Sequence, residues 1–451
     1  MVRLGILLVL LNAALPGLSP AFAADATVLP AGSVLGDEGT VEPREILHDE
    51  AAGGRQSDLV ALGNLAFASP LILGDPARRA GVACATCHRN GDANPAFFIP
   101  GLSDRPGGLA VVNGVFNPRA DNGLHRHIDI PSLRGVRFLG TYGRDGRTAS
   151  LAEFTRTVIV GEFAGPEPAP RLVDAIVAYM QQIDLLPNPR LAPDGRLTAA
   201  AGDAARRGEA LFGRPFAAMG GQSCASCHRP AALFVDRELH DVGSGGVFRT
   251  PTLLGADFTA PYFHDGRYPE FAAVVDHFDR TYGLALTDVD KSDLVAYLTA
   301  VGDGEQPWQR VTAAVELDEI EVFLRPLDRA LAERDAATVA LVVEGVAAEL
   351  RELQERYPGA GHPLGAADAA VLRPVRGAVA GLVMALRRVE TTMSGGRADD
   401  AARALAEVRD RLTAARPLLA AAEPASLFDP ERLARHRAMV AGLDPGGTPP
   451  R

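Results

Sequence analysis

Two copies of one short motif decide the fold of this chain. They are Cys84-Ala85-Thr86-Cys87-His88 and Cys224-Ala225-Ser226-Cys227-His228. The chain has 451 residues and four cysteines, and the two motifs use all four of them. Because no cysteine is left for a disulfide or a catalytic thiol, a fold stapled by disulfides is not expected.

The motif itself points to a covalently bound cofactor. Two thiols one helical turn apart can add to the two vinyl groups of one haem, and the adjacent histidine can then ligate its iron. The alternative is zinc, but zinc sites place two Cys-x-x-Cys pairs about 15–20 residues apart. Here 137 positions separate Cys87 from Cys224, and neither motif has a further ligand within reach in the sequence. The sequence therefore predicts two c-type haems.

Composition and charge exclude other classes of protein. With 47% hydrophobic and 22% charged residues, the chain is too apolar for a disordered protein. Its formal charge of −11 argues against a nucleic-acid binder, which needs a basic surface. The length suggests roughly two to four domains.

Residues 1–23 have the pattern of a secretory signal. Arg3 supplies the positive start, Leu4 to Leu15 is an apolar run, and Ala21-Phe22-Ala23 matches the cleavage rule. We expect the mature protein to be exported to the periplasm and soluble. No other stretch is expected to span a membrane.

The rest of the chain divides into an extended N-terminal arm, two haem domains and a C-terminal helical bundle. Helices are expected at 56–67, 150–160, 170–183 and 203–212, and the Pro187-Asn188-Pro189 segment marks a linker. The two haem domains read as weak internal repeats, each with a Pro-[Ser/Thr]-Leu element and an Asp-Gly-Arg turn after its motif. The predicted boundaries are 24–54 for the arm, 55–190 and 200–308 for the haem domains, and 312–445 for the bundle.

Four apolar stripes with helical spacing predict the bundle. They run over residues 317–331, 339–353, 371–386 and 405–419. We interpret this bundle as a packing or docking domain. It could form a homodimer or bind a protein partner. Nothing in it resembles a third haem site.

The sequence specifies the sixth ligand of each iron less clearly than the histidine of the motif. His125 and His127 follow the first motif and are candidate sixth ligands, or simply solvated loop histidines. His264 and His277 follow the second motif, and no methionine lies between Met219 and Met384. A methionine ligand downstream of the second motif is therefore not available.

Further residues resemble a known family, the bacterial dihaem cytochrome c peroxidases and their relative MauG. The strongest matches are Arg249-Thr250-Pro251-Thr252-Leu253, then Thr259-Ala260-Pro261-Tyr262-Phe263-His264-Asp265-Gly266-Arg267, and then Val274-Val275-Asp276. The resemblance covers about residues 55–305. It implies a mainly α fold with two tandem cytochrome c-like haem domains, to which this chain adds its C-terminal helical bundle.

The resemblance also implies roles for individual residues. His88 would be the proximal ligand of the peroxidatic haem, and His228 that of the haem where electrons enter. A calcium ion between the haems would be held near Thr259, Pro261 and Asp129. In the first haem domain the catalytic candidates are Glu162 and His127, with Glu153 as the alternative carboxylate. Either glutamate could equally be a solvated helix residue.

The chain departs from the family pattern at two positions. Where peroxidases have a methionine ligand and MauG a tyrosine, this chain has Phe278, which cannot bind iron. The second haem could then be ligated by His277, which we favour, or by Tyr282, or be five-coordinate. The tryptophan between the haems falls at Arg144, whereas Trp308 ends the second haem domain and Tyr142 lies near the interhaem position.

The leading functional hypothesis is a periplasmic oxidoreductase that reduces hydrogen peroxide with electrons from a small cytochrome c or cupredoxin. The first alternative is a MauG-like enzyme that oxidises a protein or organic substrate. The second is a non-enzymatic electron relay or redox sensor. The absence of a methionine at position 278 favours the MauG-like hypothesis, and the absence of a tryptophan at position 144 weighs against it.

Overall fold

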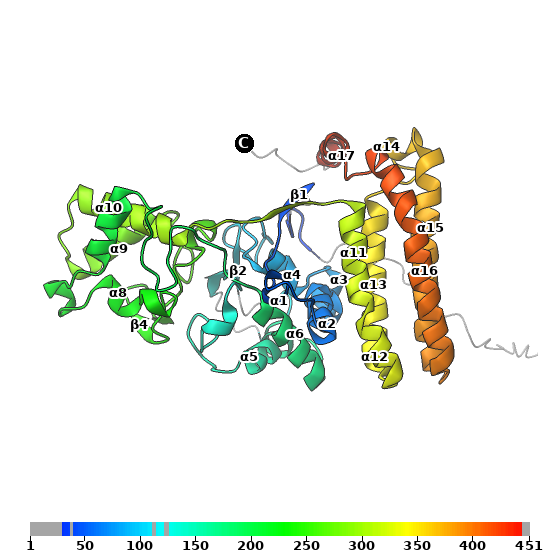
Figure 1. The fold of residues 1–451 in the computed structure, drawn as a ribbon, viewed down its shortest axis with the longest axis horizontal. Helices are drawn as coiled ribbons and strands as arrows, with labels where there is room; N and C mark the ends of the chain where they lie inside the picture. The colour runs from blue at the N-terminus through cyan, green and yellow to red at the C-terminus, as the bar shows by residue number, and fades with distance from the viewer. Residues whose placement is uncertain (1–28, 37–38, 111–113, 121–125, 444–451) are drawn as a thin grey trace, which may run out of the picture.

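The computed structural model describes residues 29–36, 39–110, 114–120 and 126–443. The predicted signal at 1–23 and the candidate ligand His125 lie outside the described residues. The chain is mainly helical, as predicted. Its parts lie in a row, with the segment around the second motif at one end, the segment around the first motif in the middle, and the C-terminal helices at the other end (Figure 1).

The segment that carries the first motif, called the first unit, contains every helix predicted for it. Helix α2 begins after Ser57, whose side chain accepts a hydrogen bond from the Val60 amide and so caps the helix. The elements up to the end of this unit are β1 (Val41–Pro43), α1 (His48–Ala51), α2 (Asp58–Ala68), α3 (Asp75–Arg79), α4 (Cys84–Cys87), β2 (Gly108–Ala110), β3 (His127–Asp129), α5 (Leu151–Thr157) and α6 (Pro170–Gln182).

The second unit repeats this order around the second motif. Its elements are α7 (Asp203–Phe212), α8 (Cys224–Cys227), β4 (Leu239–Asp241), β5 (Val247–Arg249), α9 (Phe271–Tyr282) and α10 (Asp288–Gly302). Helices α7, α8, α9 and α10 follow one another as α2, α4, α5 and α6 do. The internal repeat predicted from the sequence is therefore visible in the order of the helices.

In each unit the long helix before the motif crosses the last helix at a glycine. A Cβ atom on Gly63 of α2 would lie 1.9 Å from the carbonyl oxygen of Ala175 in α6. A Cβ atom on Gly208 of α7 would lie 2.0 Å from the carbonyl oxygen of Asp293 in α10. No other residue type allows two helix backbones to approach so closely. The same steric requirement thus fixes both crossings.

The predicted N-terminal arm is partly ordered as a strand. Strand β1 pairs antiparallel with β6 (Trp308–Arg310), so that Val41 lies opposite Arg310 and Pro43 opposite Trp308. Strand β6 joins the second unit to the C-terminal helices, and it therefore passes alongside the start of the first unit. Trp308 itself is 66% exposed.

The C-terminal region is helical, with more breaks than predicted. The stripe over 317–331 is divided into two helices at Pro326, because proline has no amide hydrogen to continue the helical hydrogen bonds. A four-residue helix is added before the helix of the third stripe, and a 14-residue helix follows the fourth. The helices are α11 (Ala313–Leu324), α12 (Pro326–Ala332), α13 (Ala336–Glu355), α14 (Pro363–Ala366), α15 (Ala369–Ser394), α16 (Ala398–Ala422) and α17 (Pro430–Leu443).

This region shares its core with the first unit. Leu62 and Leu65 of α2 belong to the same buried cluster as the apolar faces of α11, α13, α15 and α16. A Cβ atom on Gly345 of α13 would lie 2.8 Å from Leu65, and Arg325 donates a 2.6 Å hydrogen bond to the Gln56 carbonyl. The C-terminal helices are therefore packed against α2. Their solvent-exposed side is the one that faces away from α2.

Helix α15 corrects one expectation. By length and composition it is long and apolar enough to cross a membrane, although no second such stretch was expected. In the fold, its face that includes Leu372, Val379 and Leu386 is buried in the core of the C-terminal helices. A helix that is apolar because it packs in a core can have the same length and composition as a helix that spans a membrane, so these two properties do not distinguish them.

Candidate functional site

The first motif presents its histidine in a form suited to binding iron. Helix α4 is held by the Ala83 amide, which donates to the Thr86 hydroxyl at 2.9 Å. The Nδ1 atom of His88 lies 3.0 Å from the Pro131 carbonyl oxygen and therefore donates to it. The Nε2 atom is then the one that carries a lone pair. Burial lowers the pKa of His88 to about 4, which keeps the ring neutral.

The second motif repeats this geometry. Helix α8 is held by the Ser223 amide, which donates to the Ser226 hydroxyl at 2.9 Å. The Nδ1 atom of His228 donates to the Phe234 carbonyl oxygen at 3.1 Å. Burial lowers the pKa of His228 as well. Both histidines therefore direct the same nitrogen away from the backbone.

The aromatic surroundings of the two histidines also match. Phe67 of α2 lies 6.3 Å from the His88 ring and 5.3 Å from Tyr179 of α6, measured between ring centroids. Phe212 of α7 lies 6.3 Å from the His228 ring, with Tyr297 of α10 beyond it at 4.9 Å. Two equivalent centres are thus built from the same parts.

The cysteines have the environment of thiols that bind an apolar group. Burial raises the pKa of both Cys84 and Cys87 to about 12 and that of Cys224 to about 11, so that these thiols are protonated. All four cysteines are free in this structure.

Buried donors at the contact between the units offer a second test of whether a haem fits. The Nε atoms of Arg144 and Arg249 are buried and have no hydrogen-bond partner among the described residues. A buried donor without an acceptor is costly, and the carboxylates of a haem are acceptors of the required charge. Together with the free cysteines and the neutral histidines, these donors fit two covalent haems. A haem held there would supply one-electron redox chemistry.

Glu162 lies where a carboxyl group can exchange a proton near neutral pH. It ends a π-helical turn, Val158–Glu162, that follows α5. Its Oε1 atom accepts a 2.9 Å hydrogen bond from Arg147. Burial raises the pKa of Glu162 to about 7, although Arg147 opposes the rise. The alternative, Glu153, is in the first turn of α5 and accepts a hydrogen bond from Thr148 on an exposed surface. The structure therefore favours Glu162 over Glu153.

His127 lies in β3, opposite Ala110 of β2, and is half-buried. Its role as a ligand or catalytic group stays a prediction.

His277 does not have a free lone pair in this structure. Its Nε2 atom donates to the Val242 carbonyl oxygen at 2.7 Å, and its Nδ1 atom accepts from the Tyr268 hydroxyl at 2.8 Å. Iron ligation would require one of these hydrogen bonds to break, so the geometry does not support His277 as a ligand.

The next residue, Phe278, stacks against Tyr282, whose pKa is raised by burial and by nearby Cys227. Tyr282 is thus the alternative ligand that lies near the second motif.

The calcium site expected at Asp129 has a different occupant. The backbone places Asp129 beside the loop that contains Thr259 and Pro261, because the Asp129 amide donates to the His264 carbonyl at 2.8 Å. The Asp129 carboxylate, however, binds Arg105 and Arg144. Two guanidinium groups thus stand where a divalent cation was expected, and the calcium prediction at Asp129 is not supported.

Sequence reasoning missed a cluster beside the second motif. Cys227, Asp236 and His240 lie within 4.8 Å of one another, measured between their ligand atoms, and His240 is 2.7 Å from Asp236. With Cys227 assigned to a haem, no signal in the sequence singles out the other two.

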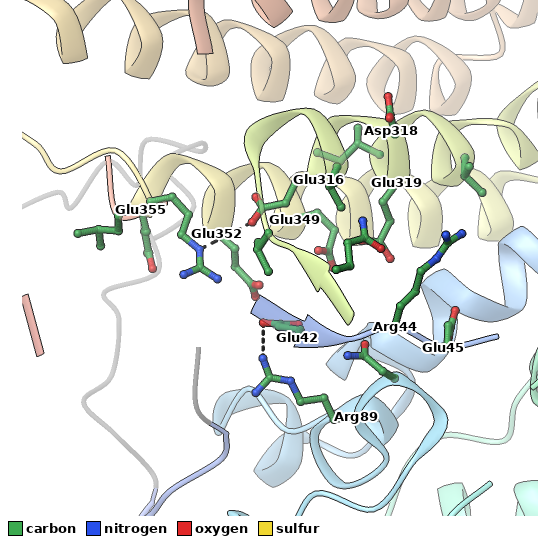
Figure 2. A pocket seen from close by; sticks show the side chains of 18 of the residues that line it. Glu42, Arg44, Glu45, Arg89, Glu316, Asp318, Glu319, Glu349, Glu352 and Glu355 are labelled. Carbon is green, nitrogen blue, oxygen red and sulfur yellow. Dashed lines mark hydrogen bonds and ion pairs between the residues drawn. The ribbon is translucent and has the colours of Figure 1, made fainter. Parts of the chain in front are cut away.

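A second missed feature is an acidic cavity between β1 and the helices α11 and α13. It has a volume of about 860 Å³. Figure 2 shows the carboxylates of Glu316, Glu349 and Glu352 on the helices facing Glu42 of β1. Burial raises the pKa of Glu316 to about 8 and that of Glu349 well above its ordinary value. This cavity forms only when the C-terminal helices pack beside β1, and no local sequence pattern predicts it.

Comparisons with known proteins identify a known family around the second motif. The model of the di-haem cytochrome c peroxidase family matches residues 204–318. MauG of Methylorubrum extorquens is 26% identical over 319 residues, which are 57% of this chain and 81% of that protein. The cytochrome-c peroxidase IdrP1 of a Pseudomonas species is 36% identical over 83 residues, which are 16% of this chain.

Other matches are shorter or more distant. The gamma subunit of hydrazine synthase from Kuenenia stuttgartiensis is 28% identical over 130 residues, or 26% of this chain. The match spans 34% of that subunit, and the match to IdrP1 spans 21% of the peroxidase. A solved structure of hydrazine synthase from the same organism is 22% identical, with a TM-score of 0.40 over 64% of this chain and all of that one. Residues 204–318 thus carry a di-haem cytochrome c peroxidase domain, and the resemblance to the peroxidase and MauG family is confirmed.

Proposed function

We propose that this protein is an exported dihaem oxidoreductase that reduces hydrogen peroxide to water with electrons from a small redox protein in the periplasm. The observation that carries the proposal is the duplicated centre. In both units a neutral histidine turns Nδ1 to a backbone carbonyl and sits behind a phenylalanine and a tyrosine. Two centres allow two electrons to be gathered for one peroxide molecule.

The residues have separate roles in this proposal. Cys84, Cys87 and His88 hold the haem of the peroxidatic centre, and Cys224, Cys227 and His228 hold the haem that receives electrons. Glu162 moves a proton between the peroxide oxygens, because its pKa of about 7 lets it both accept and donate at neutral pH. The net charge of −11 favours a basic donor protein, such as a cytochrome c or a cupredoxin.

Counting haems tests the foundation of the proposal. The pyridine haemochrome spectrum of the exported protein should give two haems per chain, and the double variants Cys84→Ser/Cys87→Ser and Cys224→Ser/Cys227→Ser one each. Two haems in any of these variants, or none in the native protein, would contradict the assignment. Turnover of peroxide with reduced cytochrome c then tests the activity, and a half-reduced protein in which neither haem binds an added ligand, followed by optical spectra and by EPR of the ferric haem, would reject it.

A MauG-like activity is the second candidate, and two observations favour it. The similarity to MauG extends over more of this chain than the similarity to the peroxidase. Phe278 cannot ligate iron, and Tyr282, stacked on it, lies near Cys227. In this case peroxide would produce a long-lived oxidised state that decays only with a protein or organic substrate. Stopped-flow spectra without an electron donor separate the two candidates.

A further inference from the structure

The two units are joined at Asp129, the last residue of β3. Asp129 is 7% exposed, and its amide donates a 2.8 Å hydrogen bond to the His264 carbonyl oxygen of the second unit. A second backbone bond crosses nearby, from the Arg249 amide to the Arg144 carbonyl oxygen at 2.9 Å. The carboxylate of Asp129 therefore lies inside the junction and not on its rim.

Two arginines of the first unit bind this carboxylate. Arg105 Nη2 donates to Oδ1 at 3.1 Å, and Arg144 Nη2 donates to Oδ2 at 3.2 Å. Arg144 Nη2 also donates to the Asp129 carbonyl oxygen at 2.9 Å. Each oxygen of the side chain thus faces a positive charge. Arg105, Arg144 and Asp129 together are called the junction cluster below.

Arg105 extends the junction cluster into the second unit. Its Nη2 atom donates a 2.9 Å hydrogen bond to the Asp265 carbonyl oxygen, 160 positions away in the sequence. The next residue, Gly266, has φ +64°, and a Cβ atom on it would lie 1.7 Å from Arg105 Nη2. Only glycine combines that backbone conformation with space for the guanidinium group.

The charge at this junction is unfavourable for a divalent cation. Calcium takes six to eight oxygen ligands, and carboxylates supply the charge that offsets its own. Here a single buried carboxylate already has two guanidinium partners. A third guanidinium, Arg249, lies close enough that burial and then Arg144 lower its pKa to about 10. Within the polypeptide alone, a further double positive charge would meet three guanidinium groups and a single carboxylate.

We propose that the junction cluster takes the place of a bound metal ion, and that an arginine tie built into the chain fixes how the two units are placed. The orientation of the two Cys-x-x-Cys-His centres is then independent of calcium. The inference rests on the proposed function only in that the oriented centres are haem centres. The tie itself is a property of the polypeptide.

Calcium binding by the native protein gives the first test. The exported holoprotein is treated with EGTA, dialysed, and titrated with CaCl2, while its thermal unfolding and its bound calcium are measured. We expect no stoichiometric binding and the same unfolding temperature with EGTA and with calcium. One tightly bound calcium per chain, accompanied by a rise in the unfolding temperature, would overturn the proposal.

Variants of the junction cluster give the second test. Arg105→Gln and Asp129→Asn should lower the unfolding temperature and expose the segment between the units to limited proteolysis, and the double variant should cost less than the sum of the two. Arg78→Gln is the matched control, because it removes an exposed ion pair with Asp75 within α3. Additive effects, or unchanged unfolding and proteolysis in Asp129→Asn, would refute the tie.

The two proposals fail in different ways. A haem count other than two would reject the dihaem function and leave the calcium and coupling results standing. If the variants do not fold, the calcium titration of the native protein still decides whether the junction cluster replaces a metal ion.

Discussion

The hydroxyl group of Tyr179 donates a 2.6 Å hydrogen bond to Oε2 of Glu45, whereas its counterpart Tyr297 has no carboxylate partner among the described hydrogen bonds. Both tyrosines stand behind the phenylalanine that touches the motif histidine. Glu45 also lines the acidic cavity. The first centre is thus joined by a hydrogen bond to the segment between β1 and α1, which lines the acidic cavity, and no such bond is described for Tyr297.

Replacing Tyr179 with phenylalanine should therefore destabilise the protein more than the same change at Tyr297. Tyr179→Phe leaves the buried Glu45 carboxylate without its donor, which costs about 1–3 kcal/mol. The loss should be larger at pH 8 than at pH 5, because burial raises the pKa of Glu45 to about 6 and the group is protonated at the lower pH. Urea unfolding at both pH values measures this difference. An equal loss in Tyr297→Phe would contradict the role of the hydrogen bond.

The acidic cavity should make the protein less stable as the pH rises. The pKa of Glu316 is raised by burial and by neighbouring glutamates to about 8, against 4.5 for the free side chain. A carboxyl group whose pKa is raised on folding contributes its full stability below about pH 4.5, and that contribution is lost as the pH rises towards 8. We expect a lower unfolding temperature at pH 8.5 than at pH 5.5.

Glu316→Gln should reduce this pH dependence, since glutamine does not ionise. Glu407→Gln is the control, because Glu407 lies on the surface of α16, and hydrogen bonds from Arg411 and Arg388 lower its pKa. That group is ionised throughout the range. A pH dependence that survives Glu316→Gln unchanged would place its source elsewhere.

The helix crossings should tolerate no side chain larger than hydrogen. In Gly63→Ala and Gly208→Ala the new methyl group would meet a backbone carbonyl at about 2 Å, so the helices must separate. Overpacking of this kind costs about 1–3 kcal/mol or more, and we expect reduced haem content in the affected unit. Gly377→Ala in α15 is the control, because nothing lies within 4 Å of its Cβ position. Equal haem content in all three variants would show that the crossings do not position the motifs.

Glu162 should control the pH dependence of peroxide turnover. Glu162→Gln should lower kcat by about 10²–10⁴, the usual size of a general acid–base contribution, and remove a pH-rate limb with a midpoint near 7. Glu153→Gln should retain that limb, because Glu153 accepts a hydrogen bond from Thr148 on the surface. Retention of the limb in Glu162→Gln, with its loss in Glu153→Gln, would reverse the assignment.

The sequence by itself determined the two motifs, the repeat and most of the helices. The spacing of Cys84, Cys87 and His88 fixes the chemistry whatever surrounds it, because the three residues are held together by one helical turn. Local periodicity predicts the helix at 170–183, and the structure has it at Pro170–Gln182; the helix expected to lead to the second motif at 203–212 is found at Asp203–Phe212. Local patterns of this kind depend on neighbours within four positions, so one sequence is enough to read them.

Tertiary structure decided the partners of the polar side chains. Asp129 was expected to bind calcium, but the fold brings Arg105 and Arg144 to it, and no local pattern records such a meeting. His277 was expected to be free for iron, but the loop between β4 and β5 brings the Val242 carbonyl to its Nε2 atom. Glu45 and Glu316 are 271 positions apart and line one cavity only because α11 packs beside β1. The electrostatic state of each group depends on these distant neighbours, and the folded chain alone supplies them.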